Sequence, residues 1–309
     1  MDVRDVGLHA IRPDVFDSSM ISDYLACESK FYMRHILGLK KDTQGVEDPA
    51  LGWGTKWHDC MYAYHPGFDL DKSLLTIDTD AKPWPVNLDQ MDRHARTQDR
   101  MRAILTDYHE HYYDRDSERV TTVRREQYFN LMVEAGDDTP FGIAPVTLAW
   151  CGRIDRLIKE DERLKINDYK TTGALASNFI EKHKHGFQFQ GYSFAGSLLQ
   201  GEFIRDTVID VLYTLKSKHE FMRPTIRFTK DHIIEWMLNM SKILDGLNAK
   251  LDESLYDLDA WIQNRGACFD WNRPCMFADA HFSPDFGGRT RLPMLVEHYI
   301  EDRWNPADI

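Results

Sequence analysis

The sequence has few cysteines, no long hydrophobic run and no excess of basic residues. Five cysteines are scattered over 309 residues, too few for a disulfide scaffold, so we expect reduced thiols or a metal site. Apolar stretches such as residues 208–215 are too short to cross a bilayer. Charged residues interrupt the N-terminal segment, so a secretory signal peptide is not expected. These features predict a cytoplasmic protein that has no membrane partner.

The formal net charge of −12 argues against simple wrapping of nucleic acid, because phosphate contacts require lysine and arginine. A site built of carboxylates would itself raise the acidic count, so an acidic chain can still act on nucleic acid. Between Leu212 and Lys230, five basic residues accompany a single acid, Glu220. This segment indicates either a basic surface or, more simply, a solvated strand and turn.

The pattern of apolar residues predicts an α/β fold. Helical spacing predicts helices over residues 18–37, 53–65, 96–114, 178–200 and 231–250. Short β-rich segments predict strands over residues 123–133, 146–158, 163–170 and 207–216. Residues 66–95 are rich in proline and aspartate and are expected to form a loop or irregular insertion, and the tail from residue 266 is expected to be irregular. This order favours a mixed central sheet flanked by helices.

The segment over residues 152–173 brings two carboxylates and a lysine together. In a strand over residues 163–170, Asp168 and Lys170 share one face with apolar neighbours. Charged groups on such a face are costly to desolvate unless they pair or bind a metal. Asp155 ends the preceding strand, and a short turn would bring it beside Asp168.

Two carboxylates and a lysine meet the needs of phosphodiester hydrolysis. Carboxylates hold Mg²⁺ or Mn²⁺, which neutralises phosphate charge and lowers the pKa of a bound water. The lysine can orient that water or stabilise charge in the transition state. The alternative is a surface hairpin with an ordinary Asp–Lys pair, and the segment alone favours neither.

The same segment resembles the catalytic core of RecB-like nucleases of the PD-(D/E)XK superfamily. The matching residues are Gly152, Asp155, Asp168, Tyr169, Lys170 and Thr171. Three further family features follow in the family order: a G-x-x-x-H helix, a Q-x-x-x-Y helix and an N-terminal motif. They are matched, respectively, by Gly54 and His58, by Gln188 and Tyr192, and by Met20, Cys27 and Phe31. Each feature is weak alone, but the joint match covers about residues 18–281 and is specific.

The resemblance implies a restriction-endonuclease-like core and a role for each matched residue. The metal would be held by His58, Asp155, Asp168 and the backbone carbonyl of Tyr169. Lys170 would position the water. Gln188 and Tyr192 would contact the substrate backbone or brace Lys170. Glu126 could add a further acidic group, although a solvated strand carboxylate is the simpler interpretation, just as His58 alone would more often be a core histidine.

Many RecB-like nucleases, including CRISPR-associated and AddB-like members, tie the N-terminal helix to the C-terminal tail with an iron–sulfur cluster held by four thiolates. Cys27, Cys268 and Cys275 stand at matching places, and His281 stands where a fourth cysteine would be expected. The sequence leaves open an iron–sulfur cluster, a zinc site, or a lost site whose thiols are now buried.

The resemblance implies one nuclease domain over residues 1–309. Its parts would be a helical N-terminal part and insertion (18–120), a catalytic sheet core (121–216), and a C-terminal helix with the cysteine-containing tail (217–309). The implied activity is DNA cleavage, more exonucleolytic than endonucleolytic, on single strands or free ends. The implied setting is recombination, repair or phage replication (then in the host cytoplasm), with a recombination or helicase partner. The alternatives are a catalytically weak module that binds nucleic acid or a partner, and a structure-specific endonuclease.

Overall fold

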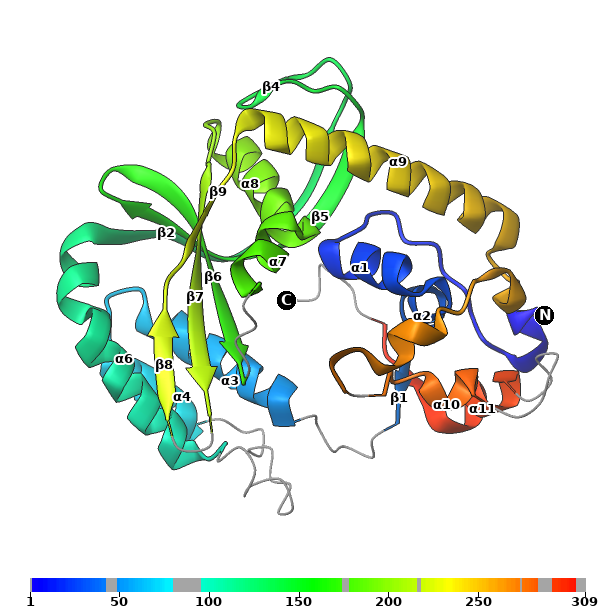
Figure 1. The fold of residues 1–309 in the computed structure, drawn as a ribbon, viewed down its shortest axis with the longest axis horizontal. Helices are drawn as coiled ribbons and strands as arrows, with labels where there is room; N and C mark the ends of the chain where they lie inside the picture. The colour runs from blue at the N-terminus through cyan, green and yellow to red at the C-terminus, as the bar shows by residue number, and fades with distance from the viewer. Residues whose placement is uncertain are drawn as a thin grey trace.

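The computed structural model describes residues 2–42, 49–79, 96–173, 178–215, 218–272, 274–282 and 291–303. In Figure 1 the left half of the molecule is a twisted sheet with its covering helices. The right half is a helical body made from both ends of the chain. The long helix α9 (Lys230–Ser254) runs from the sheet to that body. The expected mixed α/β fold, with a central sheet flanked by helices, is confirmed.

The central sheet combines antiparallel and parallel pairing. Its strands are β2 (Val120–Val133), β5 (Leu148–Glu160), β6 (Arg163–Thr172), β7 (Asp206–Thr214), β8 (His219–Met222) and β9 (Thr225–Arg227). The order is β2-β5-β6-β7-β8, and β9 also pairs with β7. β6 and β7 are parallel, whereas β5 is antiparallel to both β2 and β6. The four strands expected from the sequence are all present. A two-stranded hairpin, β3 (Asp138–Thr139) with β4 (Gly142–Ile143), links β2 to β5.

Two hydrophobic cores lie against the sheet, because successive strand residues face opposite sides. The larger core contains Ile166 of β6, and the smaller core contains Tyr169 of the same strand. α3 (Pro49–Tyr64), α4 (Leu70–Thr79) and α6 (Gln98–Arg119) supply the smaller core. α8 (Phe187–Gln200), which follows the short α7 (Phe179–His185), and α9 supply the larger core.

Glycines let α8 approach the sheet closely. A Cβ atom at Gly191 would lie 2.5 Å from Nε1 of Trp150, and one at Gly196 would lie 2.8 Å from Cδ1 of Ile166. Any larger side chain at either position would therefore push the helix away from β5 and β6. The N-terminal turn of α8 is thereby held beside β6.

Two expected boundaries were wrong. The expected helix over residues 18–37 is broken at Cys27, whose extended backbone separates α1 (Ser18–Ala26) from α2 (Glu28–Phe31) and the π-helix Tyr32–Ile36. The expected loop over residues 66–95 contains α4, and its residues 80–95 lie outside the described part. In α4, helical spacing of Leu70, Leu74 and Ile77 creates an apolar stripe that packs into the smaller core, and this packing outweighs the turn-forming composition.

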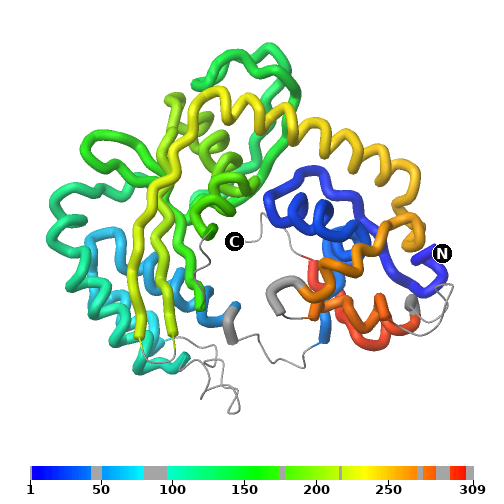
Figure 2. Tube along the Cα trace, viewed as in Figure 1, coloured from blue at the N-terminus to red at the C-terminus, as the bar shows by residue number. Residues whose placement is uncertain are grey.

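The two ends of the described chain pack together. β1 (Leu39–Lys41) pairs with β10 (Tyr299–Glu301), and Glu28 accepts hydrogen bonds from Lys250 and from the N–H of Ile262. The tail is less irregular than expected. It contains most of the 3₁₀-helix Arg265–Asn272, then α10 (Ala278–His281) and α11 (Arg291–His298), and another 3₁₀-helix, Leu258–Ala260, precedes it. A further 3₁₀-helix, Val3–Val6, opens the described chain. The Cα trace in Figure 2 shows these segments gathered into one body.

In the described part of the segment between Leu212 and Lys230, both arginines are paired with acids. Arg223 is turned inward and pairs with Asp116 and Asp210, and Arg227 pairs with Asp206. Within the part of the chain that the structure describes, no helix has the length and hydropathy to span a membrane.

Asp23 pairs with Lys30 and His35, and these contacts stabilise the N-terminal helices. Burial alone would raise the pKa of Asp23, but hydrogen bonds from His35 and Lys30 outweigh it and lower the pKa to about 2. Because the folded pKa is below the unfolded value, this stabilisation is fully present above pH 4 and is lost as the pH falls towards 2. We expect Asp23→Asn to lower the free energy of unfolding by about 2 kcal/mol at pH 7.

Urea denaturation of wild type and variant at pH 7 and pH 3 measures this difference. The gap should be smaller at pH 3, and the exposed Asp14 serves as the control, since Asp14→Asn should cost little at either pH. A gap that does not depend on pH would contradict the role assigned to the Asp23 charge.

Candidate active site

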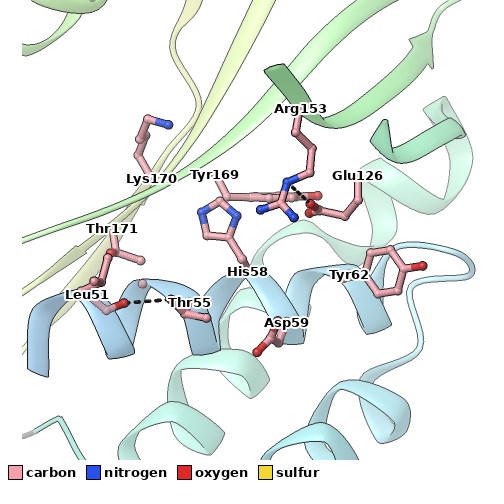
Figure 3. A pocket seen from close by; sticks show the side chains of 11 residues that line it. Leu51, Thr55, His58, Asp59, Tyr62, Glu126, Arg153, Tyr169, Lys170 and Thr171 are labelled. Atoms are coloured by element: carbon pink, nitrogen blue, oxygen red, sulfur yellow. Dashed lines mark hydrogen bonds and ion pairs between the residues drawn. The ribbon is translucent and has the colours of Figure 1, made fainter. Parts of the chain in front are cut away.

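A cavity of about 580 Å³ opens between α3 and the strands β2, β5 and β6 (Figure 3). Its lining combines residues of the expected site with others from the same elements. The lining residues are Leu51, Gly54, Thr55, His58, Asp59, Tyr62, Glu126, Arg153, Tyr169, Lys170 and Thr171. His58 and Lys170, which lie over 100 residues apart in the sequence, therefore share one cavity.

Asp155 and Asp168 lie on neighbouring strands and are withdrawn from water. Their exposed fractions are 8% and 0%. The antiparallel register of β5 and β6 brings the two side chains together, and Asp155 Oδ2 accepts a hydrogen bond of 2.9 Å from the N–H of Tyr169. Burial raises the pKa of both carboxyl groups. The expected meeting of the two carboxylates is present.

Lys170 neutralises part of this buried charge. Its Nζ lies 2.6 Å from Asp168 Oδ2, as expected for two residues that share one strand face. Nζ also lies 5.6 Å from the ring centre of Phe189 on α8. Burial alone would lower the pKa of Lys170, but Asp168 and Asp155 outweigh burial and raise it. The ammonium is therefore retained at neutral pH.

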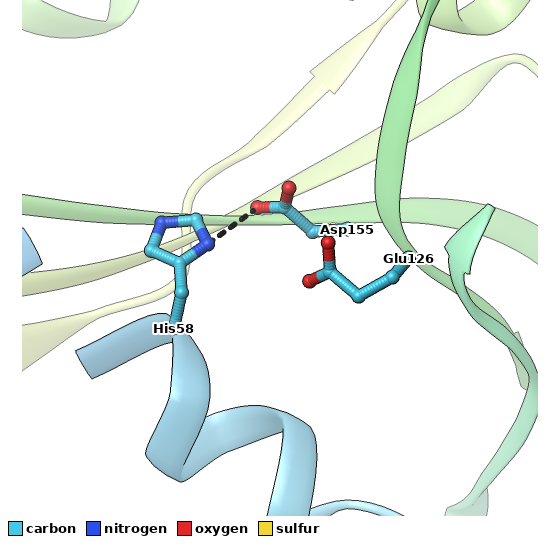
Figure 4. Close-up of side chains that lie close together, drawn as sticks. All are labelled: His58, Glu126 and Asp155. Atoms are coloured by element: carbon cyan, nitrogen blue, oxygen red, sulfur yellow. Dashed lines mark ion pairs between the residues drawn. The ribbon is translucent and has the colours of Figure 1, made fainter. Parts of the chain in front are cut away.

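His58 and Glu126 line the cavity and lie close to Asp155 (Figure 4). His58 Nδ1 lies 3.5 Å from Asp155 Oδ2. Glu126 lies opposite Asp155 on β2, next to a register shift between Thr122 and Arg124, and has the left-handed φ of 46°. Such a backbone is unfavourable for a residue with a side chain, and here it accompanies a side chain that points into the site.

The site contains a donor set that suits a divalent cation. One nitrogen of His58 and one oxygen each of Glu126 and Asp155 lie within 4.8 Å of one another, and no other such group of three occurs in the described residues. Burial lowers the pKa of His58, which favours the neutral imidazole that binds metals. Burial and the nearby Asp155 raise the pKa of Glu126 to about 7. A bound cation would offset the repulsion between these carboxylates and favour their ionised forms.

Asp168 lies beside this donor set. Its Oδ2 pairs with Lys170, and its Oδ1 is contacted by a side chain of α8. Gln188 Nε2 lies 3.4 Å from Asp168 Oδ1 and donates a hydrogen bond of 3.0 Å to the Tyr192 hydroxyl. Tyr192 is 9% exposed, so it lies behind the cavity wall. The expected pair on one face of α8 is therefore present, and its Gln188 contacts Asp168 directly.

The tail residues come together only in part. Cys268 Sγ lies 3.4 Å from His281 Nδ1, and Ser29 Oγ lies 3.1 Å from His281 Nε2. Cys27 and Cys268 are buried, while Cys275 is partly exposed and burial raises the pKa of its thiol. These four residues do not form a group of three close donors among the described residues. The iron–sulfur or zinc site stays a prediction.

Sequence reasoning missed Arg153 and Tyr62. Arg153 Nε lies 2.9 Å from Glu126 Oε2 at the cavity wall. Arg153 stands within the motif segment, two residues before Asp155, so strand alternation could have placed it on the same face. Tyr62 lies one helical turn after His58, a spacing that could have placed it on the same side of α3.

Comparison with known proteins agrees with this geometry. The family model described as "PD-(D/E)XK nuclease superfamily" matches residues 18–269. A solved structure titled "Crystal structure of SSO0001" aligns with 78% of this chain and 82% of its own, at 8% identity and a TM-score of 0.30. Among curated proteins, none matches the sequence. On the strength of the family match over most of its length, the chain belongs to the PD-(D/E)XK nuclease superfamily.

Proposed function

We propose that this protein is a metal-dependent deoxyribonuclease that hydrolyses phosphodiester bonds, with Asp155, Asp168 and Lys170 at its centre. The observation that carries the proposal is the buried pair of carboxylates beside a lysine and the His58–Glu126–Asp155 donor set. A surface hairpin with an ordinary ion pair would leave these groups solvated. Their burial behind the cavity lining is costly, and such costly buried charges are typical of functional sites.

The residues divide the work between them. His58, Glu126 and Asp155 would hold the cation, with Asp168 and the Tyr169 carbonyl beside them, and Mg²⁺ and Mn²⁺ both suit this set. When bound, the cation would neutralise charge on the phosphate and lower the pKa of a water. Lys170, fixed by Asp168, lines the cavity and would orient the attacking water or stabilise the charge that develops. Gln188 and Tyr192 would keep Asp168 in place.

The finer assignment rests on the resemblance to RecB-like nucleases. We propose exonucleolytic action on DNA with free or single-stranded ends, in recombination, repair or phage DNA metabolism, with a helicase or recombination partner.

Purified protein with Mg²⁺ or Mn²⁺ should degrade linear DNA and leave covalently closed circles of the same sequence intact. A gel that compares the two substrates measures this, and cutting of circles would favour the endonuclease instead.

Asp168→Asn and Lys170→Met should each lower the cleavage rate roughly 100- to 1,000-fold, the cost of losing one electrostatic group in an active site. Both changes nearly preserve side-chain volume, so circular dichroism should remain that of the wild type. Single-turnover cleavage of a labelled oligonucleotide measures the rate. Asp161→Asn is the matched control, because Asp161 lies in the exposed turn of the same hairpin and asparagine tolerates its left-handed backbone.

If both active-site variants cut at the wild-type rate, the assigned centre is wrong. If the wild type cuts no DNA with any divalent metal, the nuclease proposal itself fails, and a nucleic-acid-binding or partner-binding module replaces it.

Mn²⁺ should support cleavage at least as well as Mg²⁺, because imidazole is a softer ligand than carboxylate and Mg²⁺ prefers oxygen. His58→Ala should lower activity and reduce the relative advantage of Mn²⁺. Initial rates across both metals, with His185→Ala on the exposed side of α7 as control, measure this. An unchanged metal preference in His58→Ala would remove His58 from the site.

A further inference from the structure

One face of α3 forms a continuous wall of the catalytic cavity. Leu51, Thr55, His58 and Tyr62 all line the cavity, at the three- and four-residue spacing that aligns side chains along a helix. Figure 3 shows Leu51 and Tyr62 towards opposite ends of this wall, with His58 between them. At 1.5 Å per residue the wall is about 16 Å long, several times the nucleotide repeat of about 3.4 Å along a B-form strand.

Both ends of this wall present apolar surface to solvent. Leu51 is 64% exposed and Tyr62 is 46% exposed, although the neighbouring Trp57 and Met61 of the same helix are buried. Exposed apolar side chains within a cavity that holds catalytic groups indicate contact with a ligand.

The surroundings of Tyr62 suit a nucleotide. The Arg125 guanidinium lies 4.1 Å from the ring centre of Tyr62 and donates a hydrogen bond to the Tyr62 carbonyl oxygen. Arg153 lines the same cavity and is paired with Glu126. The cavity therefore combines an aromatic ring, which one arginine contacts, with a second arginine in its lining.

We propose that Tyr62 is a stacking platform for an unpaired DNA base next to the phosphate that is cut, so that the cavity selects single-stranded ends. The inference rests on the proposed nuclease function and assigns the residue that would bind the single-stranded end. Base–aromatic stacking tolerates any sequence because every base has a π-face. In a duplex the bases stack on one another, so a paired base within the helix has no free face for Tyr62.

The test measures binding rather than cleavage. A fluorescein-labelled oligothymidylate and a labelled duplex are titrated by fluorescence anisotropy in Ca²⁺, with gels to verify that each probe stays intact. Tyr62→Ala should weaken binding of the single strand roughly 5- to 150-fold and change duplex binding by less than about twofold. Tyr62→Phe should bind as the wild type does, and Tyr62→Leu, which keeps apolar bulk without a ring, should behave as Tyr62→Ala.

Tyr256 is a matched control. The Arg4 guanidinium lies 4.2 Å from the ring centre of Tyr256. Tyr256 is 39% exposed and is not part of the catalytic cavity. Tyr256→Ala should leave single-strand binding unchanged, which separates a stacking role from the general loss of an exposed tyrosine–arginine contact.

Three results would overturn the inference: wild type that does not bind the oligothymidylate, Tyr62→Ala that binds it normally, or equal losses for single strand and duplex. These results are independent of catalysis. If the wild type cuts DNA and Tyr62→Ala binds the single strand normally, the nuclease proposal stands and the stacking role of Tyr62 is wrong. Protein that binds single strands through Tyr62 but never cuts retains the platform and loses the nuclease function.

Discussion

The cost of removing two carboxylates from water governs the centre of this molecule. Asp155 and Asp168 can stay ionised side by side only where fixed dipoles and positive charge compensate them. The N–H of Tyr169 and the ammonium of Lys170 supply this compensation, and both come from the strand that carries Asp168. The close packing of α8 onto β5 and β6 excludes water from the other side and brings Gln188 to the remaining oxygen. The charges of Asp155 and Asp168 are therefore compensated by groups of β6 and α8 that the fold itself brings together.

The parts of the site that depend on regular geometry were predictable from the sequence. Asp168 and Lys170 share a face because strands alternate, and Gln188 and Tyr192 meet because residues four apart align on a helix. Glu126 was ambiguous because its direction depends on an irregular backbone, which alternation cannot predict. The break at Cys27 was missed for a similar reason. The apolar spacing continues through Cys27, and the extended conformation there depends on partners that lie far along the chain.

The net charge of −12 does not conflict with a nucleic-acid substrate once the arginines are placed. Arg223 serves the interior, where Asp116 and Asp210 hold it between α6 and the sheet. By contrast, Arg153 lines the cavity of the candidate active site, and Arg125 contacts Tyr62 of the same cavity. The total charge counts all of these equally, whereas a substrate responds to the local potential at the cavity. A few well-placed arginines are therefore compatible with an acidic chain.

The pairing of the chain's two ends has a consequence for synthesis on the ribosome. α2 has only four residues, too few to be stable alone, and Glu28 depends on Lys250 and Ile262, which are translated more than 220 residues later. The strands that carry Asp155 and Asp168 are complete well before those partners emerge. A nascent chain would therefore carry a nearly finished central sheet while its first helices still lack these neighbours. They would complete these contacts only once Ile262 has been synthesised.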